Sequence, residues 1–231
     1  LPKILSFNNF ENTRLGLGLS TNDQLSKYFE LSSYGGYGFS DREWKYGGAL
    51  LFIFLPDEKL QLKFNYQQDL REPAALVSTA EPQLFSRQLY ANRMNRWENK
   101  SVHLKGKLKH TVQFNLSFGQ NIWQPQYEYQ FDGSDLDFEK FNFTEIGVDL
   151  RFAFAEKIVR VFGTEISTSR FPLIYLSYKK GLKDVWQGEF DFHKVVFSVE
   201  DNFRIRGLGE TSIRVEAGLT SGKLPYNHLY T

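Results

Sequence analysis

The sequence predicts an all-β protein, an antiparallel β-barrel that spans a membrane, and three observations support this fold class. Apolar and polar residues alternate with a period of two along most of the 231 residues, as in strands with one apolar face. Aromatic residues make up 16% of the chain although its mean hydropathy is −0.43, a combination that suits a barrel with a polar interior. The apolar faces also hold more large side chains than one small closed barrel can enclose.

The clearest pair of strands lies in residues 192–205 and 213–220. Gly207 to Glu210 between them predict a tight turn, so we expect a β-hairpin. Each strand alternates large apolar residues with charged or small ones. The apolar residues are Val195, Phe197, Val199, Phe203, Ile205, Ile213, Val215, Ala217 and Leu219.

The same pattern repeats along the rest of the chain and predicts nine further strands. Their residues are 1–7, 14–20, 29–39, 44–55, 60–67, 102–109, 112–118, 144–154 and 174–179. With the hairpin, the sequence therefore predicts eleven strands. Glycines are dense in residues 29–39, where they indicate bends of a curved sheet or close approaches of two backbones.

The connections between these strands fall into two groups. Long segments lie on one side of the sheet, and they are residues 69–100, 121–141 and 181–190. Most short turns lie on the other side, and they are residues 22–27, 56–59, 110–111 and 207–210. Residues 154–170 are a longer, less regular connection among the short turns, and residues 41–43 are a short one among the long segments.

One long segment is predicted to contain a short amphipathic helix, in residues 82–97. Its apolar residues have helical spacing, and they are Phe85, Leu89, Tyr90, Met94 and Trp97. We expect this helix to pack on its own barrel rather than to bind a partner.

Two sets of site residues follow from the alternation. Charged residues on the polar faces are predicted to line the lumen, and they are Arg14, Glu30, Lys63, Lys105, Lys107, Glu145, Asp149, Arg151, Lys194, Glu200, Arg204, Arg214 and Glu216. Aromatic residues near strand ends are predicted to lie at the membrane interface, and they are Tyr28, Trp44, Tyr46, Tyr66, Trp123 and Tyr178. We expect opposite charges on the inward faces to pair with each other in the lumen rather than to select ions of one sign, as for Glu145, Asp149 and Arg151 beside Lys194 and Glu200.

Several classes of function are disfavoured by the composition. The net charge is +1 with both signs mixed, which argues against a nucleic-acid interface. The chain has no cysteine and therefore neither a disulfide nor a thiolate metal site, and its four histidines are scattered over different strands and turns. The acidic run in residues 132–139 lacks the spacing of a calcium loop and suits a solvated loop. We therefore expect no enzyme, no cofactor and no metal site.

Five stretches support a resemblance to a known family. They are residues 11–18 (ENTRLGLG), 43–47 (EWKYG), 171–181 (FPLIYLSYKKG), 191–194 (DFHK) and 223–226 (KLPY). Together with the order of strands and loops, they resemble the C-terminal barrel of the BamA/TamA-type outer-membrane assembly superfamily. More closely, they resemble a Bacteroidota family of unknown function that joins such a barrel to an N-terminal carboxypeptidase-regulatory-like β domain.

The resemblance implies an integral barrel of the bacterial outer membrane with sixteen strands, of which the eleven predicted here are a part. Residues 1–231 would be one barrel domain that stops before the sixth outer loop and the last strands. Residues 205–208 (IRGL) mimic the Arg-Gly motif of that loop but lie one hairpin too early, so we do not transfer its role.

The same resemblance implies a factor that inserts or translocates other outer-membrane or surface proteins. Its partners would be outer-membrane lipid and client or complex proteins of the cell envelope. Such a barrel would open an incompletely paired seam beside the strand that ends near Phe7, and it would offer a strand edge to a client. Two alternatives stay open: a barrel that serves as a pore or scaffold without assembly activity, and a soluble β-sandwich that binds a partner.

Overall fold

The computed structural model of the chain consists of two antiparallel sheets. It describes residues 4–22, 24–55, 60–71, 94–108, 111–128, 140–154, 156–161, 164–168, 171–205, 207, 209–225 and 228. Eleven strands form one sheet and two form a small separate sheet. No helix among these residues is long and apolar enough to cross a membrane.

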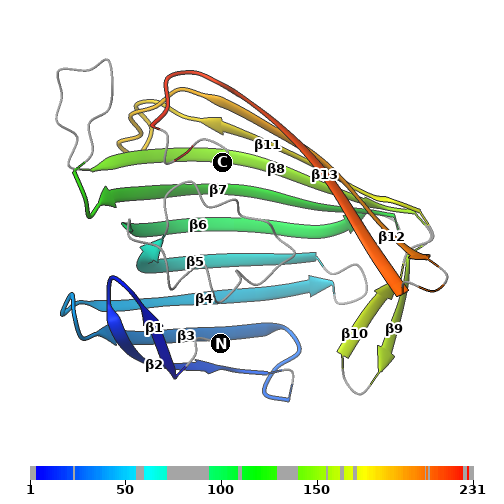
Figure 1. The fold of residues 1–231 in the computed structure, drawn as a ribbon, viewed down its shortest axis with the longest axis horizontal. Coiled ribbons are helices and arrows are strands. Elements are labelled where there is room, and N and C mark those ends of the chain that lie inside the picture. Colours follow the sequence, from blue (N-terminus) through cyan, green and yellow to red (C-terminus); the bar gives the residue numbers. More distant parts are fainter. Residues whose placement is uncertain are drawn as a thin grey trace.

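The strands follow one another along the chain. They are β1 (Leu5–Asn8), β2 (Asn12–Ser20), β3 (Phe29–Gly38), β4 (Trp44–Leu55), β5 (Leu60–Arg71), β6 (Asn95–Leu108), β7 (Val112–Pro125), β8 (Phe141–Ala153), β9 (Lys157–Val161), β10 (Thr164–Thr168), β11 (Leu173–Gly181), β12 (His193–Ile205) and β13 (Gly209–Ser221). The large sheet has the order β1 to β8 and then β11, β12 and β13, so each strand pairs with its neighbours in sequence except where the β9–β10 hairpin leaves the sheet (Figure 1). The eleven strands predicted from the alternation are therefore confirmed.

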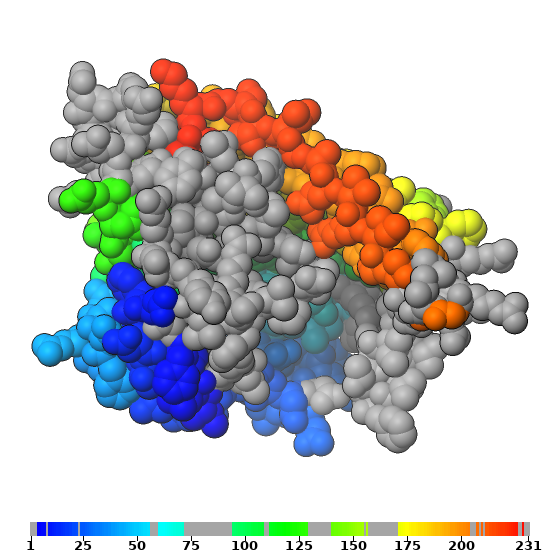
Figure 2. Space-filling model, viewed as in Figure 1, coloured from blue at the N-terminus to red at the C-terminus, as the bar shows by residue number. Residues whose placement is uncertain are grey.

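The large sheet is curved and open. Figure 2 shows β1 and β2 at one edge and β13 at the other in front of the central strands, so both edges bend toward the same side. Among the strands that the structure describes, β1 and β13 each have a single neighbour in the sheet. We call the concave side the inner face and the convex side the outer face.

The outer face is apolar and exposed. Leu17 is 72% exposed, and Leu19 and Leu219, near the two edges of the sheet, are each 78% exposed. Phe64 and Phe197 on the central and late strands are exposed on the same face. A soluble β-sandwich instead buries its apolar faces against a second sheet. The outer face therefore carries exposed large apolar side chains, and the charged residues Arg14, Lys63 and Lys105 lie on the inner face.

Several strands extend further than the sequence predicted, among them β5, β6 and β7. β5 continues to Arg71, β6 begins at Asn95 and β7 continues to Pro125, because polar residues in these strands pair across the sheet at the end where the long segments connect the strands. We call this the loop-rich end. The predicted irregular connection in residues 154–170 contains the β9–β10 hairpin instead.

The predicted helix in residues 82–97 is wrong at its C-terminal end. Residues 82–93 lie outside the described residues, but Asn95 and Trp97 belong to β6 and pair with both β5 and β7. The helical spacing of Trp97 is a coincidence, because its side chain packs on the inner face against Trp123.

Candidate functional site

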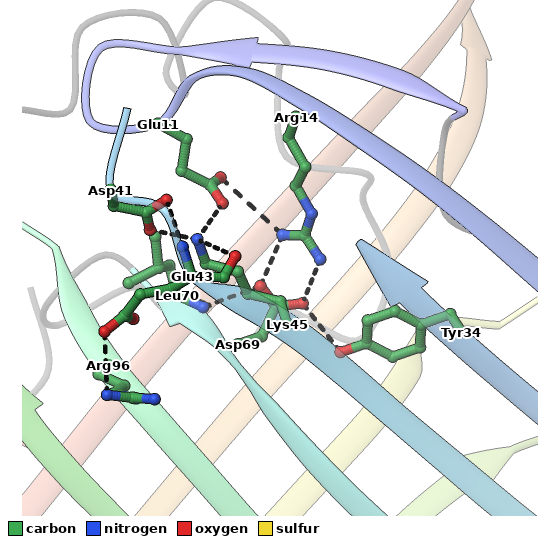
Figure 3. A network of polar contacts seen from close by, with 9 residues as sticks. All are labelled: Glu11, Arg14, Tyr34, Asp41, Glu43, Lys45, Asp69, Leu70 and Arg96. Atoms are coloured by element: carbon green, nitrogen blue, oxygen red, sulfur yellow. Dashed lines mark hydrogen bonds and ion pairs between the residues drawn. The ribbon is translucent and has the colours of Figure 1, made fainter. Parts of the chain in front are cut away.

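Buried charges join the first five strands across the inner face. Arg14 on β2 reaches over β3 and β4 to Asp69 on β5, with Nη1–Oδ1 and Nη2–Oδ2 distances of 2.6 and 3.1 Å (Figure 3). The Tyr34 hydroxyl on β3 donates to Asp69 Oδ2 at 2.8 Å. A two-point guanidinium–carboxylate contact is among the strongest and most directional in proteins. It links β2 to β5 although 55 positions separate the two residues.

A second pair of contacts extends this arrangement toward the loop-rich end. Lys45 Nζ lies 2.7 Å from Glu11 Oε1, and the two side chains are only 3% and 2% exposed. Lys45 also contacts Asp41, and Glu11 lies 3.9 Å from Arg14. A buried charge is tolerated when it is paired and hydrogen-bonded. We call Glu11, Arg14, Asp41, Lys45 and Asp69 the charge network.

Glycines make room for the charge network. A Cβ atom at Gly36 would lie 2.7 Å from Arg14 Nε, and one at Gly38 would lie 2.7 Å from Lys45 Nζ. A Cβ at Gly47 would lie 2.7 Å from Tyr34 Cε1 and 3.0 Å from a backbone oxygen. The glycines of β3 and β4 therefore leave room for Arg14 from β2, Tyr34 from β3 and Lys45 from β4 to cross above them.

The segment after β13 returns to the inner face. The His228 ring lies flat on Phe143, with 4.3 Å between ring centroids, and edge-on to Phe192. His228 Nε2 is 2.7 Å from Glu145 Oε1, and Lys194 Nζ donates to the His228 carbonyl oxygen at 2.7 Å. Phe143 and Phe192 belong to the largest buried apolar cluster in the described residues. We call His228, Phe143, Phe192, Glu145 and Lys194 the His228 cluster.

Amide side chains form a row between these two regions. Asn65 donates to Asn99 and Asn99 donates to Asn121, both at 2.8 Å, and Trp97 Nε1 donates to Asn121 at 3.1 Å. These residues come from three successive strands, β5, β6 and β7. The row therefore satisfies polar groups inside the curve of the sheet without adding charge.

The register places the predicted lumen residues on the inner face. The residues on this face, whose side chains the structure describes, are Arg14, Glu30, Lys63, Lys105, Lys107, Glu145, Asp149, Arg151, Lys194, Glu200, Arg214 and Glu216. The Arg204 side chain lies outside the described part, although its backbone belongs to β12. The lumen that these residues would line stays a prediction.

The expected pairing of the lumen residues with each other stays a prediction, and the structure also gives three of them partners outside that set. Glu145 pairs with His228, and Arg151 pairs with Glu156 at 2.6 Å. Asp149 accepts hydrogen bonds from Ser177 and Asn115. Tertiary structure decides these partners, because His228 arrives from a segment far along the chain and Glu156 from the connection after β8.

Most of the predicted interface aromatics lie on the exposed surface. Tyr28, Trp44, Tyr46 and Tyr178 are exposed, and Tyr66 lies beside Tyr46 on the outer face. Whether these positions meet a membrane interface stays a prediction.

The prediction for Trp123, one of the six predicted interface aromatics, is wrong. Trp123 is only 7% exposed and packs against Trp97 on the inner face, so it does not lie on the exposed outer face. β7 alternates regularly through Pro125, and the inward positions Asn115 and Asn121 have the same parity as Trp123. Counting by two from Asn115 would have found the correct face.

Sequence reasoning missed several residues at this site. Glu11, Asp41 and Asp69 lie at turns or strand ends, where the alternation of apolar and polar residues is a weak signal.

Trp186 was also missed. It is exposed on the connection between β11 and β12, and its ring centroid lies 4.9 Å from that of Phe118 on the outer face. Three non-glycine residues of this connection, Asp184, Trp186 and Gln187, have positive φ angles.

In the described part of the chain, no three histidine, aspartate or glutamate side chains gather closely enough to hold a metal ion. The acidic run in residues 132–139 lies outside the described residues.

Comparison with known protein families identifies a matching family model. Residues 83–220 match the family model described as the C-terminal domain of a family of unknown function, DUF5686. The match covers more than half of the 231 residues, from the region before β6 to the end of β13. No curated protein matches the chain.

Proposed function

The chain belongs to the DUF5686 family of unknown function, and on that premise we propose that it forms part of the wall of a β-barrel in the bacterial outer membrane. The observation that supports this most directly is the exposed apolar outer face over a polar, ion-paired inner face. Transfer of one large aliphatic side chain out of water contributes about 1.5–3 kcal/mol. A face this apolar is therefore stable next to lipid and costly next to water.

The lengths of the central strands suit a bilayer. β4 to β8 have 12 to 14 residues each. At about 3.3 Å per residue such a strand is roughly 40 Å long, and a tilt near 45° brings its height close to the ~25 Å apolar band of outer-membrane barrels. The exposed aromatics Trp44 and Tyr46 lie toward one end of these strands, where an interfacial girdle belongs.

We further propose that the complete barrel has about sixteen strands, as the resemblance to BamA/TamA-type barrels implies, and that it inserts or translocates other envelope proteins. The chain's own contribution would be the free edge of β1. β1 pairs with β2 over four residue pairs, whereas β6 and β7 pair over fourteen. A short strand at an edge separates from its neighbours more easily and can pair with a strand of a client.

The direction of the backbone amides on β1 defines this edge. Gly16 N donates to Ile4 O at 2.9 Å, and hydrogen-bonded pairs alternate with unbonded pairs along an antiparallel ladder. The unbonded pairs are therefore Leu5 with Leu15 and Phe7 with Thr13. Leu5 and Phe7 consequently direct their N–H groups away from β2, toward a further strand.

The test compares the folding rate of a denatured client barrel in liposomes that contain the full-length protein with the rate in empty liposomes. We expect the wild type to accelerate folding, Phe7→Ala to retain the acceleration, and Phe7→Pro to abolish it, because only proline removes the outward N–H. No acceleration by the wild type would refute the assembly function. Equal rates for the two variants would refute the role of the β1 edge.

A second candidate is a barrel that acts as a pore or as a scaffold of an envelope complex. The charge network favours a scaffold. Its contacts join β2 to β5, and they oppose separation of these strands in the barrel wall. Steady, client-independent conductance in planar bilayers would favour a pore. A chain that stays monomeric without detergent would refute both membrane functions. Neither proposal assigns a catalytic step to the chain.

A further inference from the structure

A hollow lies between the charge network and the His228 cluster on the inner face. Its volume is about 410 Å³, and β5, β6, β7, β8, β11 and β12 all contribute to its lining. Its lining includes three small residues of β6 and β7, where Ser101 faces Gly119 and Ser117 faces His103. These three positions carry no large side chain, and longer side chains of the lining surround the open space.

Cations dominate the charged lining of the hollow. The lining contains five basic side chains, Lys63, Arg71, Lys105, Lys179 and Lys194, and one acidic side chain, Glu145. The register places Lys63 on β5 and Lys179 on β11 at opposite ends of one row of facing residues. The space is therefore bordered by positive charge on two sides.

Four of these cations have no acidic partner within 4 Å in the part of the chain that the structure describes. They are Lys63, Arg71, Lys105 and Lys179. Glu145 already pairs with His228. The hollow thus differs from the charge network, in which both cations contact carboxylates.

Arg71 is held in place by aromatic rings rather than by an acid. Its guanidinium carbon lies 4.9 Å from the ring centroid of Trp97 and 5.8 Å from that of Trp123. Trp97 is fixed in turn by its hydrogen bond to Asn121. Stacking orients a guanidinium while leaving its N–H donors available for an anion.

We propose that this hollow is a binding site for a multivalent anion that bears phosphate groups. Several lysine ammonium groups and one oriented guanidinium match the charge and the acceptor oxygens of linked phosphates. A bound anion would also remove the mutual repulsion of cations that share a confined space. The same chemistry is offered by a free phosphate compound and by a phospholipid or glycolipid headgroup. The proposal does not depend on assembly activity.

The test uses tripolyphosphate and the full chain in neutral detergent micelles. Replacing Trp44 and Trp186 by Phe leaves Trp97 and Trp123 as the tryptophans of the chain, and both contact Arg71. We expect saturable quenching or shift of their fluorescence, together with matching calorimetric binding. Lys63→Gln and Lys179→Gln should each weaken binding about tenfold, as expected for loss of one charge-assisted contact.

Two further variants make the test specific. Arg71→Lys keeps the positive charge but loses the planar guanidinium group and its stacking on Trp97 and Trp123, so it should also weaken tripolyphosphate binding. Lys107→Gln should leave binding unchanged, because Lys107 lies on the inner face of β6 outside the hollow. Intact fluorescence spectra of the unliganded variants exclude misfolding as the cause of lost binding.

The proposal is overturned if the wild type shows no saturable binding at millimolar tripolyphosphate. It is also overturned if Lys107→Gln weakens binding as much as Lys63→Gln, because the anion would then respond only to overall charge. Nanodiscs distinguish the two sources of phosphate. Weaker tripolyphosphate binding in anionic than in neutral phospholipid nanodiscs identifies a lipid headgroup as the competing ligand, and equal binding identifies a free phosphate compound.

Discussion

The two halves of the inner face use charge in opposite ways. In the charge network of β2 to β5, Arg14 and Lys45 both contact carboxylates, and Lys45 is almost completely buried with Glu11. In the hollow of β5 to β12, Lys63 and Lys179 have no acidic partner among the described residues. Paired charges stabilise a particular arrangement of strands, whereas unpaired charges of one sign favour a ligand. The comparison therefore separates a structural region from a binding region on one continuous surface.

The largest expected effect compares Lys45 with Lys179. Lys45→Met removes the cation that contacts Asp41 and leaves Glu11 with only the longer 3.9 Å contact to Arg14, so we expect it to lower the free energy of unfolding by about 3–5 kcal/mol. Lys179→Met removes an unpaired cation, and we expect a change within about 0.5 kcal/mol. Denaturant titration of the folded chain in detergent or lipid measures both. Similar losses of unfolding free energy for the two variants would contradict the division of the inner face into a structural region and a binding region.

The next prediction compares the inner and outer faces of one strand. Leu17→Lys places a cation on the apolar outer face of β2, and a lysine facing the middle of a bilayer costs about 2–4 kcal/mol. Ser20→Lys places the same side chain on the inner face beside Glu30 and should cost much less. Folding yields into lipid vesicles at graded denaturant concentrations measure the difference. A fold that is stable in water would instead tolerate Leu17→Lys, because Leu17 is exposed.

The smallest expected effect tests the glycines beneath the charge network. Gly47→Ala puts a Cβ 2.7 Å from Tyr34 Cε1 and 3.0 Å from the Tyr66 carbonyl oxygen, so we expect a loss of about 1–3 kcal/mol. Gly35→Ala on the adjacent strand is the matched control, because a Cβ there meets nothing within 4 Å. Its stability should stay the same or rise slightly, since alanine has less conformational freedom in the unfolded chain. Equal losses of stability for Gly47→Ala and Gly35→Ala would mean that the glycines are needed for the backbone conformation rather than to leave room for the side chains above them.

Much of the fold could be predicted from local sequence. The alternation of Leu15, Leu17 and Leu19 with Arg14 and small residues specified β2 and its apolar face, because side chains of a strand alternate between two faces. The same rule located all eleven strands of the large sheet. It failed where polar residues continued a strand, as in the ends of β5, β6 and β7, because the apolar half of the pattern is weak there.

The sequence by itself determined the eleven strands of the large sheet and the face of most of their residues, because both depend on neighbours along the chain. Only the tertiary structure decided which inner residues meet. Arg14 reaches Asp69 because the sheet curves and glycines leave space between them, and His228 reaches Glu145 because the chain returns after β13. It also decided that Trp97 and Trp123 hold Arg71 at the edge of a hollow. Such contacts join residues far apart in sequence, and a period of two contains no information about the curvature that brings them together.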